Sequence, residues 1–282
     1  MKSPDGCIIE IIMQDKILFI IPVMNLFDQY TIHCLESVYA SKCDVPFEIL
    51  IVNQASTDQT VEKAIDFGNR KMPDRVHIIN NDKNTGCGGG WNQGIDFALK
   101  NGFTHMIIAN NDILVGPGMI QALYNRMKRE PKVLLCSAVD VIREIPVPQF
   151  VLNAENAVNK KEDTEAPHPN FSCFMITPET IERVGYIDEE FYPAFYDDND
   201  YDFRVKLAGG VNSSIANTTA VFIHYGSRTQ NQNPGAPIVP GDMFNKNGNY
   251  FISKWGGVPG KEQYTHPFND LTKDLKYAKR TS

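Results

Sequence analysis

The sequence has 282 residues, of which 42% are hydrophobic and 22% are charged, so it is long enough for one large globular domain or two small ones. The formal net charge of -7 argues against general binding to nucleic-acid backbones, and a nucleotide would need a local site. We expect one domain with a C-terminal extension.

The cysteine pattern and the lack of long apolar runs predict the compartment. Six cysteines are scattered without a Cys-x-x-Cys pair, which is typical of reduced thiols rather than of a disulfide framework or a zinc site. The N-terminus carries Asp5 and Glu10 and lacks the form of a signal peptide. No run reaches the roughly 20 apolar residues that a bilayer-spanning helix needs. We therefore expect a cytoplasmic protein without a transmembrane segment.

Short apolar runs alternate with helical patterns along the first half of the chain, after an N-terminal extension over residues 1–15. Strands are predicted over residues 16–22, 47–53, 76–80, 106–109 and 132–142. Helices are predicted over residues 27–39, 56–70, 91–101 and 117–130, and Ser56 to Gln59 has the pattern of a capping box. This alternation predicts an α/β fold with a mostly parallel sheet covered by helices on both faces.

The segment from Asn84 to Gly94 is rich in glycine. Glycines at positions 86, 88, 89 and 90 allow positive φ angles and a close approach of the backbone to a ligand. A dinucleotide-binding motif is a weaker interpretation, because the glycines follow the third predicted strand and Trp91 interrupts the Gly-x-Gly-x-x-Gly pattern.

The fourth predicted strand is followed by Asn110, Asn111 and Asp112. Ligands of open α/β sheets bind at the carboxyl ends of the strands, so this cluster predicts a ligand or metal site. A simple polar turn is the alternative interpretation.

The second half has a less regular pattern. Residues 146–169 are rich in proline, asparagine and charge, which predicts a long surface loop. A strand is predicted over residues 171–176, a helix starts at Pro178 and is closed by Gly185, and a last strand ends at His224. His224 is a candidate metal ligand, although a lone histidine is more often structural. A further helix is predicted over residues 245–255.

Four carboxylates are concentrated from Asp197 to Asp202, next to a group of aromatic residues. Carboxylates that are crowded beside aromatic walls have raised pKa values, which suits a general base. Alternatively, these acids stabilise the N-terminus of a helix through its dipole. A calcium loop is excluded because the following Gly and the distal Glu are missing.

Taken in order, these motifs resemble family 2 glycosyltransferases, and in particular the members that transfer rhamnose-like sugars or galactofuranose. The matching segments are residues 20–25, 52–58, 84–94, 110–112, 185–191 and 196–204. The resemblance implies a Rossmann-like GT-A domain over residues 16–230 and a C-terminal loop and helical tail over residues 231–282.

The resemblance also implies roles for individual residues. Asp112 and His224 would bind Mn2+ or Mg2+, and Asp198 would be the catalytic base. Asp197, Asp200 and Trp91 would bind the acceptor. The donor nucleotide would be bound by Pro22, Asn25, Asn53, Ser56, Asn84, Gly86, Gly89, Gly90, Asn92, Asn110 and Asn111.

Two of these residues differ from the family pattern, because Asn53 and Asn110 stand where the family usually has Asp. Two other residues have a structural alternative. A core role for Trp91 is as reasonable as stacking on a sugar or base, and Asp200 has a potential ion-pair partner in Arg204, one helical turn further on.

The implied reaction is an inverting, metal-dependent transfer of a sugar from a UDP- or dTDP-sugar to a hydroxyl of a glycan or glycoconjugate acceptor. One alternative is an inactive binding or scaffold protein, which the asparagines at positions 53 and 110 favour. Another is a sugar nucleotidyltransferase. That class needs a Gly-rich, basic loop after the first strand, and residues 22–30 contain no Gly, Lys or Arg.

Overall fold

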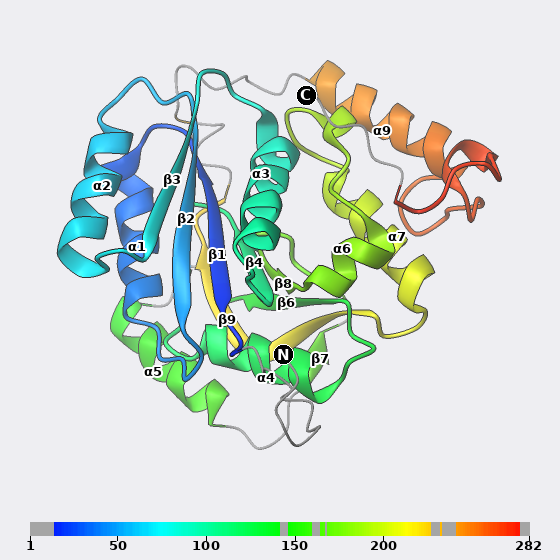
Figure 1. Cartoon of the computed structure of the whole chain (residues 1–282). Coiled ribbons are helices and arrows are strands. Elements are labelled where there is room, and N and C mark those ends of the chain that lie inside the picture. The colour runs from blue at the N-terminus through cyan, green and yellow to red at the C-terminus, as the bar shows by residue number, and fades with distance from the viewer. Residues whose placement is uncertain are drawn as a thin grey trace, which may run out of the picture.

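The structure is a computed structural model in which residues 14–141, 146–159, 164–166, 168–226, 232 and 241–276 are described. Figure 1 shows a twisted central sheet with helices on both sides. The strands are β1 (Ile17–Val23), β2 (Phe47–Gln54), β3 (Val76–Asn81), β4 (His105–Ala109), β5 (Ile113–Val115), β6 (Leu135–Asp140), β7 (Glu165–Ala166), β8 (Cys173–Ile176) and β9 (Ser214–His224).

The helices largely follow the predicted pattern. They are α1 (Ile32–Tyr39), α2 (Thr60–Lys71), α3 (Gly86–Lys100), α4 (Met119–Arg129), α5 (Val147–Val158), α6 (Pro178–Val184), α7 (Asp197–Gly209) and α9 (Gly241–Trp255). A π-helical segment, Phe27–Thr31, leads into α1, and short 3-10 turns occur at Glu189–Phe191 and Pro267–Asn269.

The sheet order is β3-β2-β1-β4-β8-β6-β9-β5, with β7 also paired to β9. Strands β3, β2, β1 and β4 are parallel, and so are β6 and β9. Strand β8 is antiparallel to both of its neighbours, and β5 is antiparallel to β9. The predicted α/β class and the mostly parallel sheet are therefore confirmed.

Alternation along β1 explains why both faces of the sheet are covered. Ile17, Phe19 and Ile21 pack in one cluster with apolar side chains of α1, α2 and α4. Leu18 and Ile20 point to the other face, where they pack with α3, α6 and α7. A strand that is buried on both faces reads as a continuous apolar run, which is how the sequence revealed it.

The predicted surface loop over residues 146–169 is wrong for its first half, because α5 forms there. Phe150 and Ala154, which are four residues apart, pack against Val221 and Ile223 of β9. The prolines at positions 146 and 148 are typical of loops, but proline is also well tolerated at the start of a helix.

The glycine-rich segment also differs from the prediction. Only Gly86 has a positive φ, of 76°, and α3 already begins there, so Gly88, Gly89 and Gly90 are helical. A Cβ on Gly94 would lie 2.2 Å from the side chain of Ile20. Most of these glycines therefore let α3 pack closely on the rest of the protein. The capping box at Ser56 is absent as well, because Gln59 caps α2 without a side-chain bond.

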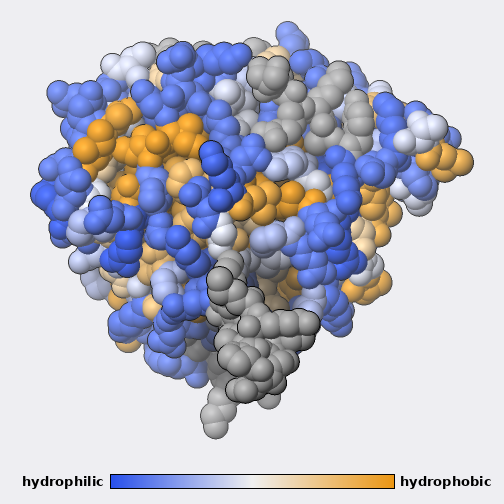
Figure 2. All heavy atoms as spheres, in the orientation of Figure 1, coloured by the Kyte–Doolittle hydropathy of each residue, from blue (hydrophilic) through white to orange (hydrophobic). Residues whose placement is uncertain are grey.

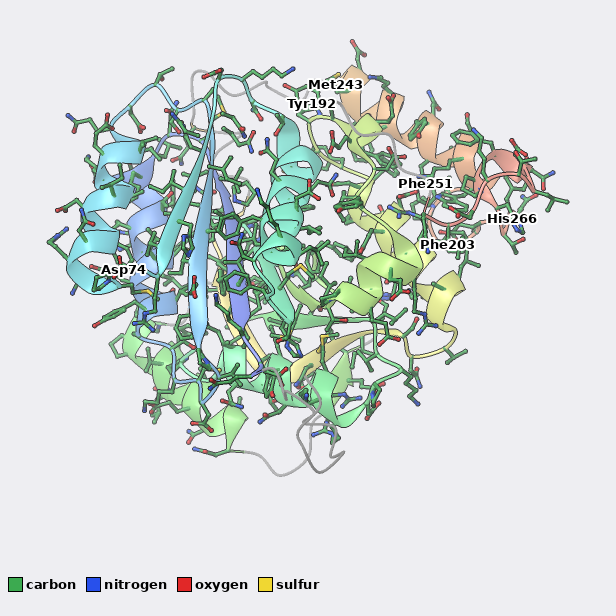
Figure 3. The ribbon with its side chains drawn as sticks, viewed as in Figure 1. Asp74, Tyr192, Phe203, Met243, Phe251 and His266 are labelled. Atoms are coloured by element: carbon green, nitrogen blue, oxygen red, sulfur yellow. The ribbon has the colours of Figure 1, made fainter. Side chains whose placement is uncertain are left out.

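The tail packs on the second half of the domain through α9. Phe251 and Trp255 of α9 form a cluster with Phe191, and Phe203 of α7 packs against it. Figure 3 shows Phe203 and Phe251 where α7 and α9 face each other. The division into a domain over 16–230 and a tail over 231–282 remains a prediction, but α9 contacts the elements that carry the acidic segment.

No helix among the described residues is long and apolar enough to cross a bilayer. The face viewed in Figure 2 is mostly hydrophilic, with separate hydrophobic patches. Five of the cysteines lie within the described residues, and all five are free thiols.

Candidate active site

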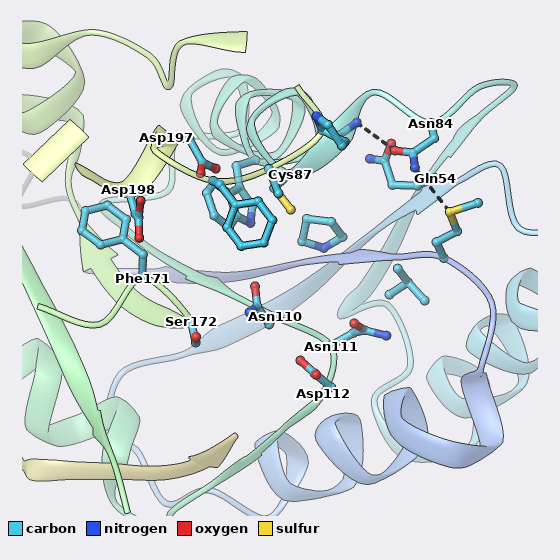
Figure 4. A pocket seen from close by; sticks show the side chains of 18 of the residues that line it. Gln54, Asn84, Cys87, Asn110, Asn111, Asp112, Phe171, Ser172, Asp197 and Asp198 are labelled. Carbon is cyan, nitrogen blue, oxygen red and sulfur yellow. Dashed lines mark hydrogen bonds between the residues drawn. The ribbon is translucent and has the colours of Figure 1, made fainter. Parts of the chain in front are cut away.

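A cavity of about 310 Å³ opens where β1, β2 and β4 end. Figure 4 shows Asp112 on one side of this cavity, with Asp197 and Asp198 across from it. The strand ends supply one wall, and the loop before α7, together with the start of α7, supplies the other. This is the position at which open α/β sheets bind ligands, and the volume is at the lower end of the range for small-molecule sites.

The sheet register brings Asp112 and His224 together, although they are far apart in the sequence. Asp112 directly precedes β5, and Ile113 of β5 pairs with His224 at the end of β9. Asp112 Oδ1 lies 3.1 Å from His224 Nε2. The Nδ1 atom of the same ring lies 3.2 Å from Ser172 Oγ. Ser172 thus contacts one ring nitrogen while the other faces the carboxylate, as in histidines that are oriented to bind a ligand.

This pair has the donor chemistry of a divalent cation site. A carboxylate oxygen suits Mn2+ or Mg2+, whereas an imidazole nitrogen favours a transition-metal ion such as Mn2+ over Mg2+. Two adjacent ligands at about 2.1 Å from one ion are about 3 Å apart. Asn110 Nδ2 also lies 3.4 Å from His224 Nε2. The described residues contain no cluster of three or more His, Cys, Asp or Glu side chains that could hold a metal ion.

The opposite wall carries Asp197 and Asp198 at the N-terminus of α7. Burial and the neighbouring Asp198 carboxylate raise the pKa of Asp197 to about 7, although backbone N–H groups at the helix start oppose this shift. Burial also raises the pKa of Asp198, against a hydrogen bond from the backbone N–H of Asn199. No ion pair to either carboxylate occurs among the described residues. Such a pair is suited to accepting a proton near neutral pH.

The thiol of Cys87 also lines the cavity, but it is not a suitable nucleophile. Burial, followed by the charge of Asp197, raises its pKa to about 12. The thiol therefore stays protonated at neutral pH, and thiolate chemistry is not favoured here.

Two buried donors of the cavity wall lack a protein partner within the described part of the chain, namely Gln54 Nε2 and Trp91 Nε1. The Gln54 side chain is held in place because its Oε1 accepts from the backbone N–H of Thr85 at 2.8 Å. Buried donors without a partner are costly, so these two atoms are unsatisfied polar positions within the wall of the cavity.

The structure brings together more than half of the predicted site residues. Those that line the cavity are Pro22, Asn84, Gly86, Trp91, Asn110, Asn111, Asp112, Asp197, Asp198 and His224. Those that are not among its described lining residues are Asn25, Asn53, Ser56, Gly89, Gly90, Asn92 and Asp200.

The first three of the excluded residues form a hydrogen-bonded network just behind the cavity. Ser56 Oγ accepts from the Asn25 backbone N–H at 2.8 Å, and Asn53 Oδ1 accepts from the Ser56 backbone N–H at 3.2 Å. Asn53 Nδ2 donates to Asn80 Oδ1 at 2.6 Å. These residues shape the ends of β1 and β2, while the adjacent Met24 and Gln54 line the cavity.

Gly89 and Gly90 approach protein atoms rather than the cavity. A Cβ on Gly90 would lie 2.6 Å from Gln54 Nε2, and one on Gly89 would lie 2.7 Å from the Thr85 side chain. We therefore interpret both glycines as packing residues: Gly90 allows the close approach of α3 to β1 and β2, and Gly89 leaves room for the Thr85 side chain at the start of α3.

Asn92 and Asp200 are saturated by protein partners. Asn92 is fully buried and its amide bonds both the N–H and the C=O of Ile187. Asp200 is fully buried and is paired with Arg204 at 2.8 Å and with Lys254 at 2.7 Å. Neither side chain is available to a ligand. Asn92 and Asp200 therefore have structural roles instead of the predicted donor-binding and acceptor-binding roles. The predicted partnership of Asp200 and Arg204 is confirmed.

Sequence reasoning missed several residues of the cavity wall. Gln54, Cys87, Ser172 and Phe195 line it, but they were not among the predicted site residues. Gln54 directly follows a predicted strand and Ser172 lies at the start of another, so their positions at strand ends were the available signal.

The sequence of residues 18–181 matches the model of the family described as glycosyl transferase family 2. The chain belongs to this family. The match spans β1 to most of α6 and thus contains the strand ends that bear Gln54 and Asp112. The acids of α7, His224 and α9 lie beyond it. The predicted family is therefore confirmed, and a glycosyltransferase is the enzyme class that it indicates.

A curated relative of this family 2 member is the low-salt glycan biosynthesis hexosyltransferase Agl10 of Haloferax volcanii. The two sequences are 27% identical over 146 residues, which is 47% of this chain and 47% of the relative. The chain thus matches about half the length of this curated relative.

Solved structures of TarS from S. aureus have a similar fold. TarS residues 1–349 superpose with a TM-score of 0.56 and 15% identity, covering 84% of this chain and 72% of that one. A longer TarS chain gives a TM-score of 0.54 with 16% identity, covering 84% of this chain and 44% of TarS. A complex of TarS 1–349 with UDP gives a TM-score of 0.50 with 16% identity, covering 84% of this chain and 72% of TarS 1–349. These similarities support the predicted GT-A fold of the family 2 member.

Proposed function

We propose that this chain transfers a sugar from a nucleotide-diphosphate donor to a hydroxyl of a glycan or glycoconjugate acceptor, with inversion at the anomeric carbon. The observation that carries the proposal is the arrangement of the cavity. The Asp112–His224 pair lies on one side, and two carboxylates with raised pKa values lie across from it.

The donor would be bound at the strand ends. Asp112 and His224 would hold Mn2+ or Mg2+, and the cation would neutralise the charge that develops on the diphosphate leaving group. Gln54 Nε2 and Trp91 Nε1, two buried donors without a partner among the described residues, would donate to polar atoms of the donor. A uridine or thymidine diphosphate sugar is proposed, and the UDP complex of the structurally similar TarS supports it.

Asp198 would act as the base on the opposite side. The acceptor hydroxyl oxygen attacks the anomeric carbon, its proton moves to the Asp198 carboxylate, and the bond from the anomeric carbon to the diphosphate oxygen breaks. The electron pair of that bond leaves with the diphosphate. Asp197 lies one residue away and would hold the acceptor or adjust the pKa of Asp198 through its charge.

A transfer assay with product analysis tests the proposal. The protein is incubated with UDP- and dTDP-sugars, including rhamnose and galactofuranose donors, with a set of acceptor glycans and with Mn2+ or a chelator. We expect a new glycosidic bond whose anomeric configuration, read by NMR, is opposite to that of the donor, and which requires the metal. A product with retained configuration would contradict direct displacement.

The compartment follows from the same proposal. A nucleotide-sugar donor and free thiols fit a cytoplasmic location, which remains a prediction.

A further inference from the structure

Two aromatic side chains near the carboxylates are partly exposed, one that lines the cavity and one that packs against it. Phe195 lines the cavity and is 37% exposed, and Phe244 of α9 is 45% exposed. Their ring centroids lie 5.5 Å apart, with an interplanar angle of 71°. We call Phe195 and Phe244 the aromatic shelf. Large exposed apolar side chains at the rim of a cavity point to an interaction site.

The backbone that carries the shelf is held in an unusual conformation. Phe195 and Tyr196 have φ angles of 76° and 68°, in the left-handed region that bulky residues rarely adopt. Such conformations persist only where the surroundings enforce them, and they cluster at functional sites. Here the loop presents the Phe195 ring at the cavity just before the acids of α7.

Helix α9 supplies the contacts that hold this loop. The buried Asn247 side-chain amide donates to the carbonyl oxygens of Ala194 and Phe191 at 2.9 Å and of Phe195 at 3.3 Å. Gly248 makes room for Tyr196, because a Cβ at this position would lie 3.0 Å from the tyrosine Oη. The ring of Tyr196 in turn lies 5.1 Å from that of Phe244. The tail and the loop thus form one packed unit.

Resting on the proposed function, we propose that the aromatic shelf is the acceptor subsite and that it binds the apolar face of a sugar ring of a glycan acceptor. Sugar rings combine C–H faces with polar edges, and aromatic rings beside hydrogen-bonding groups match both. Phe195 lies two and three residues before Asp197 and Asp198. All three residues line the same cavity, so a ring on the shelf would lie on the side of the cavity that bears the carboxylates.

The surroundings favour a sugar over a lipid chain. The positions one helical turn from Phe244 on α9 are Gly241, Asn247 and Gly248, none of which adds an apolar side chain beside it, and the exposed Asn199 follows Asp198. An acyl chain needs a continuous apolar surface, whereas a sugar ring uses separate aromatic and polar contacts.

Saturation-transfer difference NMR tests the subsite without a donor. The probes are methyl glycopyranosides of glucose, galactose, N-acetylglucosamine and rhamnose, together with octyl β-D-glucopyranoside below its micelle concentration. Irradiation of the protein aromatic protons should saturate the ring C–H protons of at least one probe. Phe244→Ala and Phe244→Leu should raise the Kd by about fivefold or more, and Phe244→Tyr should retain binding.

Ile252→Ala is the matched control, because Ile252 is also an exposed apolar residue of α9, at 40% exposure. It should leave binding unchanged, and the thermal midpoint of each variant shows that it folds. No ring saturation in the wild type, or equal binding by Phe244→Leu, overturns the proposal. Saturation confined to the octyl chain overturns it in favour of a lipid, and a dimer that Phe244→Ala dissociates overturns it in favour of a second copy. Nucleotide binding, measured alone, tests the proposed function separately.

Discussion

The first turn of α7 holds carboxylates in two opposite environments. Asp200 is fully buried, and its carboxylate contacts Arg204, Lys254 and the Trp255 Nε1 donor. Asp197, three residues earlier, faces the cavity and has no ion pair among the described residues. Burial disfavours both charges, but the neighbouring cations lower the pKa of Asp200, whereas that of Asp197 rises to about 7.

This contrast separates a structural carboxylate from a reactive one, although both belong to the same acidic run. Two of the partners of Asp200, Lys254 and Trp255, come from α9. Asp200, which has cationic partners, holds α7 against α9. Asp197 and Asp198, which have no ion pair among the described residues, face the cavity. The charge state of each acid thus depends on contacts from elsewhere in the chain rather than on its position in the run.

Among the cavity-facing acids, Asp198→Asn is expected to have the largest effect, and that effect is on the transfer rate. Removing the base should lower the transfer rate by about 10²- to 10⁴-fold, because an amide cannot take the acceptor proton. Nucleotide affinity and thermal stability should stay near those of the wild type. Single-turnover assays measure the transfer rate, and nucleotide titration measures the affinity. Full activity of the variant would exclude Asp198 as the base.

Lys254→Met tests the structural role of the buried Asp200 carboxylate. The fully buried Lys254 Nζ lies 2.7 Å from Asp200 and 2.8 Å from Asp188, so its loss leaves buried negative charge with fewer partners. We expect about 3–5 kcal/mol less free energy of unfolding, measured by urea denaturation. Lys206→Met is the matched control. Lys206 pairs with Asp202 but its side chain is 46% exposed, so the cost should stay below about 1 kcal/mol. Equal costs would contradict the account.

The two tryptophans provide a smaller test of the same contrast. Trp255 Nε1 donates to Asp200 at 2.8 Å, whereas Trp91 Nε1 has no partner in the described part of the chain. Trp255→Phe should cost about 1.5–3 kcal/mol of stability, because it removes a hydrogen bond to a charged group. Trp91→Phe removes no hydrogen bond to a described residue, so it should cost less stability than Trp255→Phe, and it should lower nucleotide-sugar affinity by about fivefold. The reverse pattern would remove Trp91 Nε1 from the ligand site.

Asp197→Asn tests the raised pKa itself. Because the pKa of Asp197 is about 7 in the folded state and 3.8 is the ordinary value, the folded state binds more protons between these pH values. Wild-type stability should therefore lose this contribution as the pH rises from about 4 to about 7, and the variant should lack that loss. Urea denaturation across this pH range measures the difference. A difference between the two proteins that does not change with pH would exclude a raised pKa.

Much of the fold could be predicted from the sequence, because buried strands such as β1 and β2 are continuous apolar runs between clear helical patterns. Helix α5 was missed because its leading prolines resemble loop signals. The pairing of Asp112 with His224 followed from the family resemblance, and the sheet register accounts for it. The pairing of Asp200 with Arg204 followed from helical spacing, but its pairing with Lys254 could not be predicted, because Lys254 lies more than fifty residues away in the sequence.

The most direct test of the central claim is the thermal midpoint of the protein against a panel of nucleotides and nucleotide-sugars, each with Mn2+ and with a chelator. A ligand that binds only the folded state raises the midpoint. We predict an Mn2+-dependent rise with a uridine or thymidine diphosphate sugar, and its loss in Asp112→Ala. No rise with any ligand, or a rise that needs neither Mn2+ nor Asp112, would contradict the metal-dependent donor site.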